Sequence, residues 1–217
     1  REDVIAFIYL CILLFIIIFS LYLISINSKK CPVKIQRFYF ITLSIIVIRY
    51  LSLLSLWIVQ HQRIIYIIKE LTQLTFVGMP LLALASFYIF LRDENRKFDY
   101  NYSFMIILFF TYIVINLFYK LDIRVDNTFG FIVSYKDMLI PSLIYLIIMS
   151  SMVVVTLLFL DKPYSNKSGM VFLLISLAIT VVEFILFLGG IKLFPYPVLG
   201  EFAMIGCSYK AISTFKK

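Results

Sequence analysis

Residues 4–26 read VIAFIYLCILLFIIIFSLYLISI, a run of 23 residues without a single charged side chain. At 1.5 Å per residue, a helix of this length crosses the roughly 30 Å of hydrocarbon in a bilayer. The run is too long for the core of a signal peptide, and no small-residue cleavage site follows it. It therefore predicts a transmembrane helix that stays in the protein.

The same pattern recurs along the chain. Polar loops separate six further apolar stretches, at 38–60, 71–91, 102–119, 138–160, 169–190 and 193–209. None alternates like a barrel strand, so helices are the spanning form that satisfies the backbone hydrogen bonds. The sequence predicts an all-α, polytopic membrane helical bundle of seven transmembrane helices, as a single domain over residues 1–217. The segment 61–70 either extends the third helix outward or lies along the membrane surface.

Composition supports the bilayer as a partner. The chain is 63% hydrophobic and only 15% charged, whereas soluble domains are about half apolar and a quarter charged. Its net charge of +8 does not indicate nucleic-acid binding, because the basic residues lie in short clusters between apolar runs. The three cysteines and the single histidine, His61, have no metal-ligand spacing, so we expect no metal and no cofactor.

The orientation follows from the basic residues near the ends of the spans, which favour the cytoplasm. Twelve of them fall on one side and six on the other: Lys29, Lys30, Lys34, Arg37, Arg92, Arg96, Lys97, Lys162, Lys167, Lys210, Lys216 and Lys217 against Arg1, Arg63, Lys120, Arg124, Lys136 and Lys192. This bias predicts an outside N-terminus and a cytoplasmic C-terminus in the cell (plasma or inner) membrane. A further domain could then follow in the cytoplasm, and we expect the chain to be the N-terminal part of a longer protein.

Three charged residues lie inside the predicted spans, where each costs at least about 2.5 kcal/mol. Arg49 is near the middle of the second span, and Glu183 and Glu201 are near the outer ends of the sixth and seventh. Arginine can bind a carboxylate through two parallel hydrogen bonds, so a buried ion pair is one interpretation. A ligand pocket that opens outward is another, with the candidate binding residues Arg49, Glu70, Gln73, Asn116, Glu183 and Glu201. In a third, Pro195 and Pro197 delay the seventh helix and keep Glu201 near water.

The residue inventory argues against an enzyme. With one histidine, no His-based metal site or His-activated nucleophile can be assembled. Glu183 and Glu201 are the only acids deep in the spans, and no phosphate-binding glycine loop occurs. We identify no catalytic residue.

Three segments carry a resemblance to a known family. They are residues 68–82 (IKELTQLTFVGMPLL), 115–119 (INLFY) and 193–200 (LFPYPVLG), the last followed by YKAI at 209–212. They resemble the third helix, the end of the fourth helix and the proline-rich entry and basic exit of the seventh helix in the seven-transmembrane sensor region of bacterial histidine kinases and related diguanylate cyclases. Unlike many members, this chain has no histidine between Asn116 and Asp137.

The resemblance implies a sensor or receptor-like domain that relays a small-ligand or membrane signal to a cytoplasmic output module such as a histidine kinase. It also implies a homodimer. The alternatives are a small transporter, or the substrate-binding membrane subunit of one, in which the same polar residues bind a solute. A membrane subunit that acts only in assembly with partners is a third reading.

Overall fold

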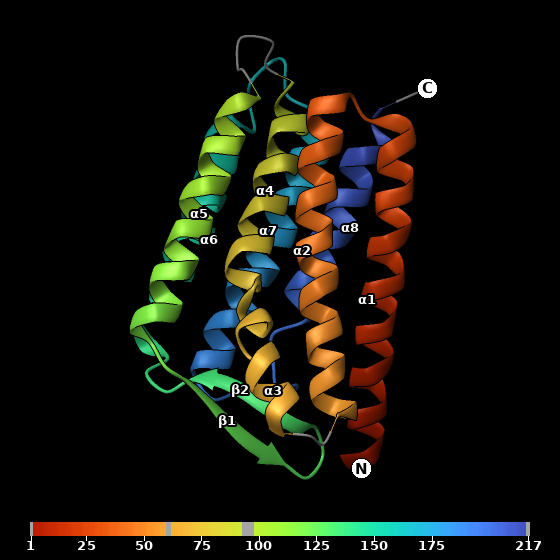
Figure 1. Cartoon of the computed structure of the whole chain (residues 1–217). Coiled ribbons are helices and arrows are strands. Elements are labelled where there is room, and N and C mark those ends of the chain that lie inside the picture. The colour runs from red at the N-terminus through yellow and green to blue at the C-terminus, as the bar shows by residue number, and fades with distance from the viewer. Residues whose placement is uncertain (1, 60–61, 93–97, 216–217) are drawn as a thin grey trace.

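The computed structural model describes residues 2–59, 62–92 and 98–215. Long helices lie side by side in one bundle, and a β-hairpin covers one end of it (Figure 1). The elements in chain order are α1 (Glu2–Lys30), α2 (Val33–Ile58), α3 (Gln62–Ile68), the 3₁₀ helix η1 (Glu70–Gln73), α4 (Thr75–Leu91), α5 (Asp99–Phe118), β1 (Leu121–Asp126), β2 (Gly130–Tyr135), α6 (Leu139–Phe159), α7 (Lys167–Leu188) and α8 (Leu199–Ser213).

Six helical segments in the described part of the chain are long and apolar enough to cross a membrane. They are Val4–Lys30, Val33–Ile58, Glu70–Leu91, Asp99–Phe118, Leu139–Phe159 and Lys167–Leu188. Each contains at least the roughly 20 residues that a span requires. The protein is therefore mostly helical, with the architecture of a multi-pass membrane protein, as the sequence predicted.

The seventh predicted span differs from the structure. The sequence predicted a helix over 193–209, but α8 begins at Leu199 and has only 15 residues. Pro195 and Pro197 explain the late start, because proline lacks the amide hydrogen and disfavours helical backbone in the residue before it. At 1.5 Å per residue α8 is about 22 Å long, shorter than the hydrocarbon layer. A helix start delayed by these prolines formed part of the third interpretation of Glu201 given above.

The connection over residues 120–136 is an antiparallel hairpin rather than an irregular loop. β1 pairs with β2 from Leu121 opposite Tyr135 to Asp126 opposite Gly130. The Asp126 carboxylate accepts the backbone N–H groups of Thr128 at 2.8 Å and of the next residue at 3.0 Å, which closes the turn. Gly130 has a φ of 76°, a conformation that side chains disfavour.

Helix α4 is the centre of the bundle. Over an apolar stretch of 18 residues in its span 89% are buried, against 22% in the corresponding part of α5 and 28% in that of α6. It packs against α2, α5, α6, α7 and α8. Close approach to α2 occurs at Gly78, where an added Cβ would lie 3.1 Å from Cγ1 of Ile46. The outward faces of the peripheral helices are apolar and exposed, as a lipid environment requires.

In the segment predicted either to extend the third helix or to lie along the membrane surface, the described residues 62–68 form a separate short helix, α3. α3 packs beside the hairpin, since Ile65 and Tyr66 share a surface depression with Ile123 and Phe131. Two sets of predictions fall outside the described residues. One is the position of His61 at the start of the segment 61–70, and the other is the placement of the basic residues Arg1, Arg96, Lys97, Lys216 and Lys217.

Candidate functional site

The structure joins two of the charged residues that the sequence placed in apolar surroundings. Arg49 lies on α2 and Glu201 lies in the first turn of α8, and each is only 2% exposed. Nη1 of Arg49 donates a hydrogen bond to Oε2 of Glu201 and forms an ion pair with it. Glu201 is therefore buried and not exposed at the surface, which contradicts the third of the interpretations offered from the sequence.

Glu201 is bound by two further helical side chains. The Tyr50 hydroxyl donates to Oε2, and the Thr75 hydroxyl donates to Oε1 at 2.8 Å. Arg49 in turn donates from Nε to the Thr72 carbonyl oxygen at 3.1 Å. This polar cluster of Arg49, Tyr50, Thr75 and Glu201 satisfies both charges with short-range partners, which is the condition under which an ion pair is tolerated in an apolar interior.

A small cavity lies beside the polar cluster. It has a volume of about 30 Å³, and Arg49, Gln73 and Thr75 supply polar groups to its wall. Residues of the hairpin and of the segment 189–198, including Val133 and Tyr196, close it. A cavity of this size holds one or two water molecules or a small ion, whereas pockets for metabolites start near 300 Å³. A larger ligand would bind there only after the hairpin or the segment 189–198 had moved.

Glu183 binds backbone amides and does not form the ion pair with Arg49 that was one interpretation of the sequence. Its carboxylate accepts the backbone N–H groups of Leu199 at 3.0 Å and Gly200 at 2.5 Å, the first two residues of α8. The N-terminal amides of a helix have no partner within the helix and carry a partial positive charge, so a carboxylate stabilises them. Glu183 therefore caps α8. It also lines a second, larger cavity of about 380 Å³ on the surface of the bundle.

The other three candidates lie near the hairpin end of the bundle. Gln73 donates from Nε2 to the Val133 carbonyl oxygen at 3.2 Å and so holds β2. Asn116 accepts a hydrogen bond from the Tyr135 hydroxyl at 2.9 Å. The side chain of Glu70 is exposed. The six candidates thus do not line one cavity: Arg49 and Gln73 line the small one, Glu201 lies beside Arg49, and Glu183 lines the larger one.

Tyr196 connects the hairpin to the segment before α8, and the sequence did not indicate this role. Its hydroxyl accepts the Val133 N–H at 2.8 Å and donates to the Val133 carbonyl oxygen at 3.2 Å. Burial raises the pKa of the Tyr135 hydroxyl, so this group remains a protonated donor at neutral pH. The position of Tyr196 between two prolines was the signal available in the sequence.

Within residues 2–59, 62–92 and 98–215, no three histidine, cysteine or acidic side chains lie close enough to hold a metal ion. No protein-family model and no curated protein matches the chain. The fold and the polar cluster therefore define only a class, a helical membrane protein with a buried ion pair that joins α2 to α8.

Proposed function

We propose that the chain is a membrane sensor domain, in which a signal received at the hairpin end of the bundle changes the position of α8. The proposal includes a seventh crossing, formed by the segment 189–198 together with α8. The observation that carries it is the position of Glu201. This residue lies in the first turn of α8 and is bound by side chains of α2 and α4.

The contacts of α8 make it a suitable transmitting element. At its first turn, α8 is held by the polar cluster and is capped by Glu183 of α7. Near its other end, Nζ of Lys210 donates to the Ser168 hydroxyl at 2.9 Å, at the start of α7. Figure 1 places the hairpin at one end of the bundle and the C-terminal end of α8 at the other. A change in the partners of Glu201 would therefore be carried along α8 to the C-terminal end.

A switch of this kind needs two arrangements of similar energy and a signal that binds one of them better. The polar cluster offers such a choice, because its hydroxyl and guanidinium groups can donate either to Glu201 or to a ligand in the adjoining cavity. Shifts of about 1–2 Å between packed helices are typical of such transitions.

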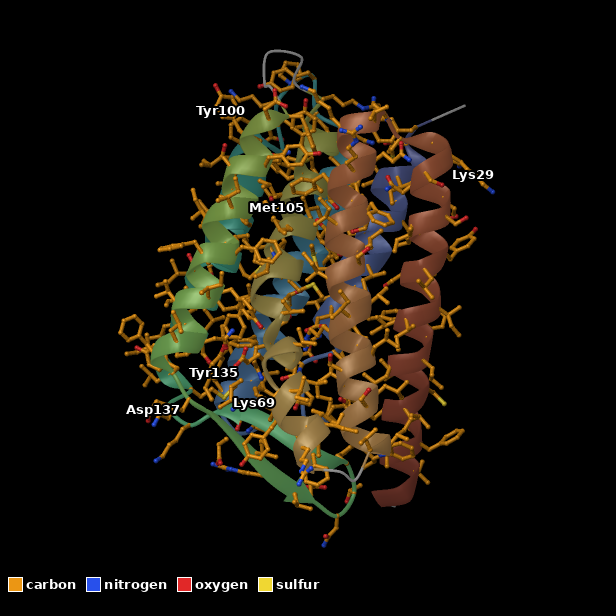
Figure 2. All side chains as sticks on the ribbon, viewed as in Figure 1. Lys29, Lys69, Tyr100, Met105, Tyr135 and Asp137 are labelled. Carbon is orange, nitrogen blue, oxygen red and sulfur yellow. The ribbon has the colours of Figure 1, made fainter. Side chains whose placement is uncertain are left out.

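The orientation in this proposal has the hairpin outside and the C-terminus in the cytoplasm. Figure 2 shows Lys29 at the opposite end of the bundle from Lys69, Tyr135 and Asp137. Basic residues favour the cytoplasmic side, and Lys29 belongs to the richer of the two groups. Single cysteines at Ser28 and Thr128 test this arrangement. A membrane-impermeant maleimide should label Thr128→Cys in intact cells and Ser28→Cys only after lysis, and the reverse pattern would overturn the topology.

The sensor proposal is tested by distances in the protein itself. With the three native cysteines replaced by serine, spin labels at Ser28→Cys and Ser213→Cys report the position of the end of α8 in nanodiscs. We expect Glu201→Gln and Thr75→Val to shift the mean distance by about 2 Å, whereas the exposed change Asp99→Asn leaves it unchanged. If neither Glu201→Gln nor Thr75→Val changes the mean distance, α8 does not respond to the polar cluster. A reading frame that continues past codon 217 into a kinase or cyclase would support the proposal independently.

A transporter is the second candidate, because a buried ion pair beside a polar cavity can also bind a solute. Under that reading Glu183→Gln and Glu201→Gln should lower solute uptake by cells that express the protein. Unchanged uptake in both variants would remove the transporter. The homodimer expected from the family resemblance stays a prediction under either function.

A further inference from the structure

The larger cavity is a groove between α7 and the segment 189–198. Its volume of about 380 Å³ falls within the range of small-molecule sites. On one side it is lined by Ile179, Val182 and Leu186 of α7, and on the other by Leu193 and Phe194. Its walls are therefore hydrocarbon and aromatic, which suits the apolar part of a ligand.

The groove opens toward the lipid. Ile179, Val182 and Leu186 are 41%, 55% and 43% exposed, on the face of α7 that points away from the bundle. Between Ala178 and Leu186 the groove follows α7 for about 12 Å. A ligand would enter it from the bilayer with its chain along α7, so we expect a molecule that already dissolves in the membrane.

Glu183 is the single charged residue among those that line the groove. A carboxylate has about four acceptor positions, and the backbone N–H groups of Leu199 and Gly200 use two of them. Among the described residues, no lysine or arginine forms an ion pair with Glu183, and the Lys192 ammonium group at the groove lies instead over the Phe187 ring, 4.5 Å from its centroid. A carboxylate in such apolar surroundings is stabilised by an opposite charge that brings hydrogen-bond donors.

We infer that this groove binds a single-chain amphiphile with a protonated primary amine, the alkyl chain lying along α7 and the ammonium group bound to the Glu183 carboxylate. The amine has up to three donors and a positive charge, and so complements the one charged group of the groove. A fatty acid of the same length would place two carboxylates together, which is unfavourable.

Binding has a consequence for α8, and this step rests on the proposed function. An ammonium group at Glu183 competes for the oxygens that cap Leu199 and Gly200. The first turn of α8 is then less strongly held, and Glu201 lies in that turn. The ligand would thus act on the same helix end as the polar cluster.

The test is photolabelling of the whole chain in phosphatidylcholine nanodiscs with a diazirine-bearing dodecylamine. Peptides that cover 178–199 should be labelled, and a tenfold excess of dodecylamine should suppress the label while dodecanoic acid does not. Glu183→Gln should weaken the competition by dodecylamine about tenfold. Equal competition by amine and acid, or equal labelling of α5, whose lipid-facing surface is also apolar, would overturn the site.

Glu183→Gln could change labelling by disturbing the start of α8, so two further variants test the groove without altering Glu183. Val182→Trp fills the groove and should abolish the label, whereas Val154→Trp, on the exposed face of α6, should leave it intact. Labelling of Val182→Trp at the wild-type level would reject the groove. Hydrogen exchange at the Leu199 and Gly200 amides should increase several-fold with dodecylamine. If labelling occurs and exchange is unchanged, the binding site stands and the coupling to α8 fails.

Discussion

Removal of Glu201 tests the energetics of the polar cluster. In Glu201→Ala the Arg49 guanidinium stays in a position that is 2% exposed and loses the carboxylate that neutralises it. The Tyr50 and Thr75 hydroxyls lose their acceptor as well. Leaving one member of a buried pair without its partner costs about 3–5 kcal/mol, so we expect the free energy of unfolding to fall by that amount.

A variant in which both Arg49 and Glu201 are replaced separates the cost of an unpaired charge from the cost of the lost contacts. Replacing both members of a buried ion pair by apolar residues is often nearly neutral, because no unpaired charge remains. We therefore expect Arg49→Leu/Glu201→Leu to be more stable than Glu201→Ala by about 2 kcal/mol or more. The matched control is Lys34–Asp99, an ion pair of 2.9 Å whose side chains are 67% and 61% exposed. Removing Asp99 should have a much smaller effect.

Reversible unfolding by SDS in bicelles is the assay, and fluorescence of the single tryptophan, Trp57, reports tertiary structure. The single variants Arg49→Leu and Glu201→Leu complete a double-mutant cycle with their double variant, and Lys34→Leu and Asp99→Leu do the same for the control pair, so each cycle gives a coupling energy. If the coupling between Arg49 and Glu201 were no larger than that between Lys34 and Asp99, the pair would not organise the interior as we argue.

Three further predictions use the same unfolding assay or amide exchange. Gly200→Ala should lower stability by about 1–3 kcal/mol, because its Cβ would lie 2.5 Å from Cα of Thr180. At Gly206 an added Cβ would meet no atom within 4 Å, so Gly206→Ala should raise stability by about 0.5–1 kcal/mol. Equal effects of the two glycine substitutions would contradict the packing of α7 on α8. Burial raises the pKa of Tyr135 in the hairpin above its ordinary value of about 10, so the unfolded state loses this proton first and stability should fall as the pH rises above about 10. Tyr135→Phe should lack that part of the fall, and an identical pH profile would refute the assignment. Glu183→Ala should cost about 1 kcal/mol and speed exchange at the start of α8, whereas unchanged exchange would mean that Glu183 is no cap.

Much of the fold could be predicted because hydrocarbon imposes a simple length rule. The span predicted at 71–91 corresponds to Glu70–Leu91, and that predicted at 169–190 to Lys167–Leu188. The hairpin was missed, although LDIRVD at 121–126 alternates apolar and charged residues as a half-buried strand does. That pattern was available, but a strand needs a partner, and pairing across a turn is decided by more than local preference.

The partners of the charged residues could not be predicted to the same degree. The sequence singled out Arg49, Glu183 and Glu201, because an ionised group in an apolar span has to find compensation. It did not decide that Glu201 binds Arg49 while Glu183 caps α8. This choice depends on where α8 begins and on how far each helix is rotated toward its neighbours, and neither quantity is encoded in one helix alone.

The sequence by itself determined that this is a helical membrane protein and which charged residues need partners inside it. Both conclusions follow from the free energy of transfer into hydrocarbon, which depends on residue type and on the length of each run. Tertiary structure alone decided that Arg49 and Glu201 meet, that Tyr196 holds the hairpin, and that Glu183 lies in a separate groove. Those contacts arise from helix packing, in which the register and rotation of neighbouring helices are set together by the close fit of their side chains.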